Sequence, residues 1–499
     1  MTDEEFTAWL KDQSALRCVL VEAEYSYESR GSFYDDSIYF STKGYTTSPT
    51  DTPPNLNYPA RIKGGVKFTE KISLTGNAGL QFGDIEIDNS DGYYDYLFKY
   101  AWTNQNILIV IGDVGWPRAD FRTIFNGTIA NIASRNRNSI NIKLRDKLQR
   151  LNTPMTDVKL GGSSSNADRL IPLTFGECFN VRPLLIDVAT HKYQFHNSSS
   201  ESVIEVRDNG VPVNKSSDLP NGTFTLFAQP AGEITASVQG DNDTAYENTI
   251  AKIIERIVTG YGLASTRFTA GDLDAANLAQ FDIDNPQPIG IYSSQRLTVV
   301  RAIQQLASSI GAQVVMSREG LLQLIQINSN FNSPVMLIND QKIKEHSMKV
   351  SSLPEMSAAI KIGYCKNYTV QQNLQTGIPE DHKDLFYDEW LTFTKTNSSV
   401  ASGYMLTDEP IQKDTNLITA NDAESEATRL LDLKSSKLII YQFVGFAEMF
   451  DLRLGDTVTL DNRRFQLDQE DGMVVELSPD WMTNMITVSV LCVFQSAQS

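Results

Sequence analysis

The stretch that decides the fold is Phe121 to Arg145, FRTIFNGTIANIASRNRNSINIKLR. It divides into two segments, 121–133 and 139–145, that have the length and composition of β-strands. Within the first segment, Asn126-Gly127 is a dipeptide typical of turns. We therefore expect this region to belong to a β-sheet.

Strand patterns continue on the N-terminal side of this stretch. Leu16 to Tyr27 alternates apolar with polar or small side chains, as a half-buried strand does. Further strands are expected at Gly64–Leu74, Ala78–Asp88 and Ile107–Gly112, after a loop at Ser41–Pro59. A short aromatic helix is expected at Tyr93–Trp102 and a helical turn at Asp146–Leu151, which Pro154 stops. The spacing of the strands predicts a β-barrel or β-sandwich.

The middle of the chain changes from strands to helices. LGGSSSN, at 160–166, is expected as a flexible linker, and 171–238 as a second, small β unit. Two amphipathic helices are expected at Tyr246–Gly260 and Leu297–Ile310, because each places its apolar residues at spacings of three and four. A hairpin follows, with strands at Gly311–Val315 and Leu321–Ile327 around Arg318-Glu319-Gly320. Helices followed by a hairpin indicate an α/β domain.

Strands dominate again from about residue 341. One helix is expected at Ala423–Lys434 with Asn421 as its N-cap, and a hairpin turn at Asp461-Asn462 between strands 457–460 and 464–467. The fold class is therefore mainly β with α+β, multidomain, with two barrel-like β domains flanking a small β domain and an α/β domain. The predicted boundaries are 1–158, 167–240, 241–340 and 341–499.

Composition restricts the function. The formal net charge is −18, from 61 acidic and 43 basic residues. Surfaces that grip phosphate backbones are positive, so this balance favours a soluble protein, or a wall past which nucleic acid slides without sticking. No stretch reaches the roughly 18 apolar residues of a membrane-spanning helix. The acidic N-terminus, with Phe6, Trp9 and Leu10 on one helical face, is unlike a secretory signal.

Residues suited to metal binding or catalysis are sparse and scattered. Cys18, Cys178, Cys365 and Cys492 form no close pair, which predicts buried free thiols. The four histidines, His191, His196, His346 and His382, form no metalloprotease motif. His191 and His196 are expected in one strand at odd spacing, so that their side chains point to opposite faces. Phosphate-binding glycine loops are absent from the sequence.

Two further segments have a structural and a functional interpretation. The acidic run 83–92, GDIEIDNSDG, suggests calcium, but strand alternation explains it better: Ile85 and Ile87 face inward, the acids face water and Asp91-Gly92 turns. The aromatic stretch could stack sugars, although a subunit contact is the more frequent use of such rings. It comprises Tyr93, Tyr94, Tyr96, Phe98, Tyr100 and Trp102. We predict no catalytic residue, no cofactor site and no metal site.

Several segments together carry a family resemblance. FGDIEIDNSDGYYD (82–95), IGDVGWPRADFRTIFNGTIANI (111–132) and INIKLRDKLQRLNTP (140–154) succeed one another as in the N-terminal domain of phage tail-tip and baseplate hub proteins. IPLTFGECFNVRPLLID (171–187), the segment 296–327 and LDLKSSKLIIYQFVGFAEMFDLRLGDTVTL (431–460) resemble later parts of such proteins. The order of the segments is what identifies the resemblance.

The resemblance implies a non-enzymatic structural role. Hub proteins of this kind form trimers whose first and last barrels alternate in a pseudo-six-fold ring. The ring continues the tail tube, lets the tape-measure protein and DNA pass without specific binding, and anchors a central fibre or spike. The implied partners also include distal tail or tail tube proteins. The implied location is the virion tail tip, after synthesis in the host bacterial cytoplasm and without membrane insertion.

Alternatives remain at this stage. The chain ends without a fibre or peptidase extension, so we expect receptor binding and wall digestion to belong to other proteins. A distal-tail ring, a receptor-binding adhesin, or a glycan-cleaving tail enzyme with an acid pair are the other candidates. An iron–sulfur cluster assembled from the distant cysteines is a further alternative, because some tail-tip proteins carry one.

Overall fold

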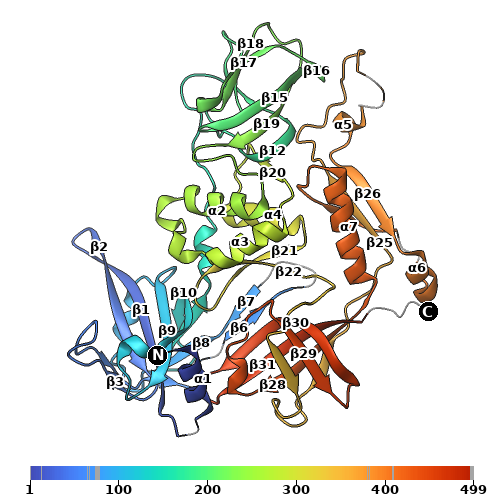
Figure 1. The fold of residues 1–499 in the computed structure, drawn as a ribbon. Helices are drawn as coiled ribbons and strands as arrows, with labels where there is room; N and C mark the ends of the chain where they lie inside the picture. Colours follow the sequence, from blue (N-terminus) through green and yellow to red (C-terminus); the bar gives the residue numbers. More distant parts are fainter. Residues whose placement is uncertain are drawn as a thin grey trace.

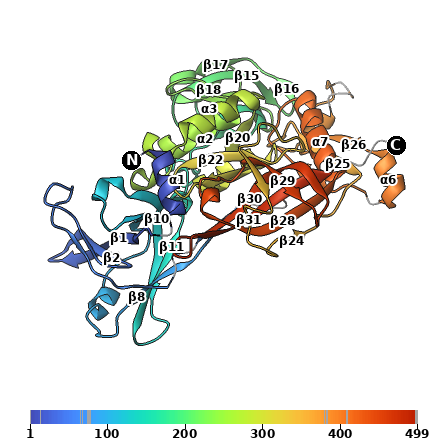
Figure 2. The same ribbon diagram turned by 60° about the horizontal axis from the view of Figure 1, so that its bottom comes forward.

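A computed structural model describes residues 2–12, 14–64, 66, 68–73, 79–378, 380, 383–406 and 409–494. The two ends of the chain form β-sheets that lie next to each other, with the helices of the middle segment above them (Figure 1). The small β unit lies beyond those helices, at the opposite end of the molecule from the terminal sheets. In a second view the two terminal sheets again lie side by side (Figure 2).

The N-terminal sheet has the strand order β2-β1-β9-β10-β11-β8-β5 and is nearly closed into a barrel. Its strands are β1 (Arg17–Ser29), β2 (Ser32–Ser41), β5 (Ile62–Lys63), β8 (Asp84–Asp88), β9 (Asn106–Asp113), β10 (Arg122–Ala133) and β11 (Ser139–Arg145). The turn predicted at Asn126-Gly127 is wrong, because β10 runs straight through it. A Cβ at Gly127 would lie 2.6 Å from the carbonyl oxygen of Arg145, so glycine serves strand packing here.

Short helices flank this sheet. The predicted aromatic helix is reduced to a 3-10 helix, η1 (Asp95–Lys99), and the helical turn before Pro154 is confirmed as η3 (Lys147–Leu151). Short strands β3 (Tyr45–Thr46) and β4 (Asn57–Tyr58) lie in the predicted loop. Tyr58 is fully buried there, so this loop closes over the outer face of the sheet.

The C-terminal sheet has the order β23-β29-β30-β31-β28-β24. Its strands are β23 (Met336–Asn339), β24 (Lys349–Ser352), β28 (Lys437–Gly445), β29 (Thr457–Asn462), β30 (Leu467–Asp480) and β31 (Met485–Phe494). The turn predicted at Asp461-Asn462 is wrong: both residues belong to β29, and the chain reverses after them. A register shift between Leu460 and Asn462 carries the strand past the polar pair.

The two terminal sheets share one topology. Five strands occur in the same sequence order and the same antiparallel arrangement: β5-β8-β11-β10-β9 in one sheet and β24-β28-β31-β30-β29 in the other. In each, a strand precedes a three-stranded meander and pairs with the last strand of that meander. A 3-10 helix lies between that strand and the meander, η1 in one half and η8 (Ala447–Met449) in the other.

The described part of the middle segment contains α-helices, a two-stranded hairpin and the two sheets of the small β unit. Its helices are α2 (Ile250–Gly260), α3 (Ala275–Asp284) and α4 (Val299–Ser308), and its hairpin is β21 (Ala312–Met316) with β22 (Leu322–Gln326). The predicted helices and hairpin are confirmed, whereas α3 is an addition. The small β unit is built from β12 (Leu173–Val181), β13 (Leu184–Asp187), β14 (Lys192–Gln194), β15 (Ser200–Asp208), β16 (Val211–Pro212), β17 (Lys215–Asp218), β18 (Thr223–Leu226) and β19 (Ile234–Asp241), and β20 (Gly290–Ser293) joins it.

Between β24 and β28 the chain leaves the C-terminal sheet. The described part of this segment forms a three-stranded sheet and helices. They are β25 (Ala359–Tyr364), β26 (Leu391–Thr396), β27 (Gln412–Asp414), α5 (Asp384–Tyr387), α6 (Ser398–Tyr404) and α7 (Ala420–Lys434). Asn367 forms a bridge with Phe179 of the small β unit, and α5 lies beside that unit, whereas α6 lies far from it (Figure 1). The predicted cap of α7 is wrong: Thr419, not Asn421, accepts the hydrogen bond from the Asp422 amide.

The predicted fold class, mainly β and multidomain, is confirmed. The four domain boundaries stay a prediction. Among the described residues, no helix has the length and apolar character needed to cross a membrane.

Candidate functional site

The feature most informative for function is the junction between the two terminal sheets. A single hydrophobic cluster contains residues from both of them. The rings of Phe68 and Phe125 lie 5.5 Å apart, and those of Phe450 and Trp481 lie 4.5 Å apart. Burying apolar surface from both sheets in one core fixes their relative position.

A strand pair crosses the junction. β6 (Phe68–Lys71) and β7 (Gly79–Phe82) lie between β5 and β8 in the chain, yet β6 pairs with β30 of the C-terminal sheet. The N-terminal half therefore contributes strands to the other sheet. Backbone hydrogen bonds as well as side-chain packing join the halves.

The N-terminal helix crosses the junction as well. α1 (Asp3–Lys11) begins with a capping box in which Thr2 and Glu5 bond each other's backbone amides. Its apolar face enters the shared core, as predicted. The Thr7 hydroxyl donates to Asp451 at 2.8 Å, and the Asn484 side chain donates to the carbonyl of Leu10. The helix is thereby attached to the C-terminal half.

The tip of the β21–β22 hairpin fits between the two sheets. The Asn126 amide of β10 donates to the Arg318 carbonyl at 2.8 Å, and Arg318 Nη2 donates to the Leu452 carbonyl at 2.7 Å. Gly320 has a φ of +80°, and a Cβ there would lie 2.6 Å from the Asn126 carbonyl oxygen. The tip thus holds all three parts of the chain together and needs glycine at this position.

Two side chains of opposite charge are buried behind this tip. Glu70, on β6, is 4% exposed, and Arg318 is 7% exposed. Burial raises the pKa of Glu70, and the neighbouring Arg318 opposes that shift. Burial also raises the pKa of Asp456, which accepts a hydrogen bond from the Arg453 amide. Glu70 and Arg318 are therefore held inside the junction and away from water, whereas Asp456 is half-buried.

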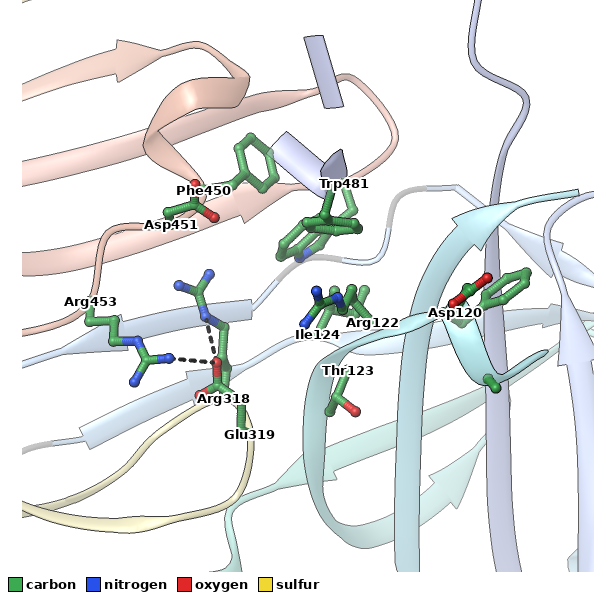
Figure 3. A pocket seen from close by; sticks show the side chains of 13 residues that line it. Asp120, Arg122, Thr123, Ile124, Arg318, Glu319, Phe450, Asp451, Arg453 and Trp481 are labelled. Atoms are coloured by element: carbon green, nitrogen blue, oxygen red, sulfur yellow. Dashed lines mark ion pairs between the residues drawn. The ribbon is translucent and has the colours of Figure 1, made fainter. Parts of the chain in front are cut away.

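In front of the tip lies a cavity of about 850 Å³. Figure 3 shows Arg122, Ile124 and Trp481 on one side, and Arg318, Glu319 and Arg453 on the other. Glu319 lies 3.7 Å from Arg318 and 3.9 Å from Arg453, so its carboxylate pairs with both arginines. The lining as a whole holds three acidic and three basic side chains, Asp120, Glu319, Asp451, Arg122, Arg318 and Arg453. The lining is a set of compensated charges beside aromatic rings, which suits a contact between packed parts better than a reaction.

The cysteines are dispersed over the fold. Cys18, Cys178 and Cys492 are buried and Cys365 is half-buried. Burial raises the pKa of each of these four thiols. Cys178 and Cys365 line one cavity of about 80 Å³, whereas the other two belong to the terminal sheets. Among the described residues, no group of three or more metal-binding side chains is placed to hold an ion.

The histidines occupy unrelated positions. The expectation that His191 and His196 share a strand is wrong, since β14 spans Lys192–Gln194 and His191 has a φ of +54° in the preceding turn. His346 is exposed. His382 lies outside the described residues.

His196 belongs to a buried polar network. Its Nδ1 accepts the Thr174 amide proton at 3.1 Å, so the ring proton is on Nε2, which faces Ser198 at 3.0 Å and Asp241 at 3.3 Å. Hydrogen bonds from His196, Arg256 and Tyr261 outweigh burial and lower the pKa of Asp241 to about 2. A catalytic base would need an acceptor nitrogen facing the serine. Here that nitrogen is occupied by backbone, so the network joins β12, β19 and α2.

The acidic run behaves as strand alternation predicts. Ile85 and Ile87 are buried in the core. Outside, Asp88 pairs with Lys63 at 2.6 Å and Asp91 pairs with Arg61 at 2.7 Å. The carboxylates face bases instead of converging on one point.

The aromatic stretch forms a ladder of rings on the surface. Tyr93, Tyr96, Tyr100, Tyr27 and Tyr34 follow one another with centroid distances of 6.4, 5.9, 5.6 and 5.8 Å. The last two rings come from the β1–β2 hairpin. The sequence identified the stretch, but its continuation across the hairpin depends on the fold.

The chain has likenesses among solved structures that extend over most of its length. No family model and no curated protein matches it. Among solved structures, the 43 kDa tail protein of prophage MuSo2 from Shewanella oneidensis matches with a TM-score of 0.40 and 13% identity, over 95% of this chain and 98% of that one. A tail protein from Neisseria meningitidis MC58 matches with a TM-score of 0.42 and 9% identity, over 96% of each chain. A chain of a gene transfer agent virion matches with a TM-score of 0.42 and 11% identity, over 71% of this chain and 92% of that one. The first two of these structures are described as tail proteins, and at such identities the likeness is one of fold.

Proposed function

We propose that this chain is a structural subunit of a phage tail tip, a baseplate hub that continues the tail tube as a trimeric ring. The observation that carries the proposal is the repeated topology. One chain holds two sheets of the same strand order, side by side in a fixed junction. Three such chains present six similar sheets, which is the number that a hexameric tube offers for docking.

The junction has the properties that this role requires. A ring under a tube must keep its positions while DNA and the tape-measure protein pass. Strand exchange through β6, the tie through α1 and the hairpin tip at Arg318 each connect parts that are distant in sequence. These contacts therefore hold the two terminal sheets of each chain in a fixed relative position.

The negative net charge of the chain suits a channel through which DNA passes. A net charge of −18 disfavours adhesion of a polyanion, so DNA would pass the lumen without specific binding. The small β unit, with predicted bounds 167–240, lies far from the terminal sheets and is proposed to contact neighbouring tail proteins (Figure 1). Tube or distal tail proteins would dock on one side of the ring, and a central fibre or spike on the other.

A non-enzymatic role is part of the proposal. The His196 network has its acceptor nitrogen occupied by backbone, and the junction cavity has compensated charges. An adhesin or a glycan-cleaving enzyme would need a site that these features do not supply.

Native mass spectrometry combined with negative-stain electron microscopy of the purified chain tests the proposal. We expect a three-chain species that appears as a closed ring with a central hole. A chain that stays monomeric at all accessible concentrations, both alone and with the adjacent tail proteins, would contradict it.

A further inference from the structure

The contact between the two terminal sheets within one chain indicates where two chains contact each other. The β6–β7 pair is inserted between β5 and β8 and reaches the C-terminal sheet at Glu476 and Leu477 of β30. This point lies just past the end of β29, whose first residue, Thr457, pairs with Met473. Glu476 follows Met473 by three residues.

At the matching point in the N-terminal sheet, residues 103–105 hydrogen-bond to Ile129 and Ala130, and Asn131 lies just beyond them. There β9 begins at Asn106, which pairs with Thr128 of β10. Three residues further on, Asn131 is exposed and lies past the end of β9. This end of the sheet faces away from the C-terminal half in both views (Figures 1 and 2).

A projecting arm starts at this same end. The pairing of β1 with β9 stops at Ala23, and Ser26 forms one further bridge with Ala101, whereas the pairing of β1 with β2 continues to Ser29. Residues 24–37 therefore form a two-stranded ribbon whose base is held by this bridge and whose tip projects beyond it. Its outer strand β2 is also the edge of the sheet.

Aromatic side chains are exposed along the arm and the adjacent η1. Phe33 is 77% and Tyr93 is 67% exposed, and Tyr34, Tyr96 and Phe98 are also exposed. Several large aromatic groups in one surface region mark a contact site more often than a free surface. The base of the arm is packed, since Tyr25 and Tyr27 both contact the ring of Tyr100, whereas Phe33 and Tyr34 near its tip are exposed.

The second half of the chain offers a matching edge. By the shared topology, β24 corresponds to β5, and the segment after β24 corresponds to β6–β7. β24 is the edge of its sheet, and all four of its residues are exposed. Val350 and Leu353 add exposed apolar surface.

The two surfaces are complementary in charge. Residues 24–37 contain four carboxylates, Glu24, Glu28, Asp35 and Asp36, and one arginine. Residues 341–353 contain three lysines, Lys342, Lys344 and Lys349, and one glutamate. Opposite charges of this kind orient two surfaces and disfavour wrong partners.

We propose that the arm end of one copy, made of residues 24–37 and η1, docks against the β24 edge and residues 341–353 of a second copy. This inference rests on the proposed ring and names its intermolecular contact. The contact would lie beside the end of the N-terminal sheet that corresponds to the end of β30 contacted by β6 within a chain. Three internal junctions and three such contacts between chains would close the ring.

Photocrosslinking tests the contact directly. The photoreactive amino acid p-benzoylphenylalanine replaces Phe33 in the full chain, and the same amino acid replaces Phe227 as a control, since Phe227 is 72% exposed on the small β unit. We expect two-chain adducts from position 33 that map by mass spectrometry to residues 341–353, and none of that kind from position 227. Adducts from position 33 that map elsewhere on the second copy would overturn the contact.

Exchanging the charges of the two surfaces tests this contact separately from the formation of the ring. Glu28→Lys with Asp35→Lys should raise the concentration needed for assembly about tenfold or more, and Lys344→Glu with Lys349→Glu added should restore assembly. Assembly that is unaffected by the first pair would overturn the contact while the ring stands. A wild-type chain without any three-chain species would contradict the ring as well.

Discussion

Replacing Arg318 by methionine should weaken the junction strongly, and in a pH-dependent way. Arg318 and Glu70 are 7% and 4% exposed, and the charge of Arg318 opposes the rise in the pKa of Glu70, so removal of the arginine takes a favourable charge away from a buried carboxyl group. Arg318→Met also removes the hydrogen bond to the Leu452 carbonyl. Losing a hydrogen bond made by a charged group costs about 1.5–3 kcal/mol. We expect the free energy of unfolding to fall by about 2–3 kcal/mol at pH 7.

The pH dependence follows from the pKa of Glu70. Burial already raises this pKa above its usual value of 4.5, and Arg318 opposes the shift. Without Arg318 the pKa rises further, so the folded variant keeps a proton that the unfolded chain releases above pH 4.5. Stability of the variant therefore decreases as the pH rises above 4.5, and its deficit shrinks on acidification from pH 7 toward 4.5.

Urea unfolding at pH 7 and pH 5, followed by tryptophan fluorescence, measures both effects, since Trp481 lines the same junction. The matched control is Glu70→Gln combined with Arg318→Met, which removes both charges and should lose less stability than Arg318→Met alone. The reasoning is refuted if Arg318→Met has the same deficit at both pH values and the double variant is no more stable.

Further variants test other parts of the account. Gly320→Ala should cost about 1–3 kcal/mol in thermal unfolding, because φ is +80° and the Cβ would press on the Asn126 carbonyl, whereas Gly377→Ala, with no atom within 4 Å of the added Cβ, should be neutral. Burial raises the pKa of Asp146 from 3.8 to about 6, so stability is lost as the pH rises through this window, and Asp146→Asn should add about 1–3 kcal/mol at pH 7 and flatten the profile. His196→Ala should lower the melting temperature by several degrees, because the Thr174 amide loses its acceptor; a variant as stable as wild type would contradict the structural role of that network.

The spacing of apolar residues in the sequence predicted the strands and helices that bury one side against the core. Ile85 and Ile87 alternate with acids and are buried as expected, and α2 has its isoleucines on one side. In both cases the sequence period matches the geometry of the element, so no distant information was needed.

The errors share a physical cause. Asn126-Gly127 and Asp461-Asn462 are good turn signals, but cross-strand neighbours keep both pairs in strands. α3 was missed, although Asp274 as N-cap with Leu278 and Phe281 on one side gave a signal. Tertiary contacts decide such cases, and local propensity does not describe them.

The candidate site was beyond sequence reasoning for the same reason. The Asn126–Arg318 and Arg318–Leu452 hydrogen bonds join residues from three distant segments. Nothing in the local pattern around Glu70 indicates that its carboxylate is buried against an arginine. The resemblance predicted two barrel-like ends, while their common strand order emerges only from the pairing of the strands.

Single-particle cryo-electron microscopy of the assembled ring tests the central claim most directly. The account predicts three chains around a channel, with N-terminal and C-terminal sheets alternating at about 60°. A ring lined by only one of the two sheets, or an assembly with another number of chains, would contradict it.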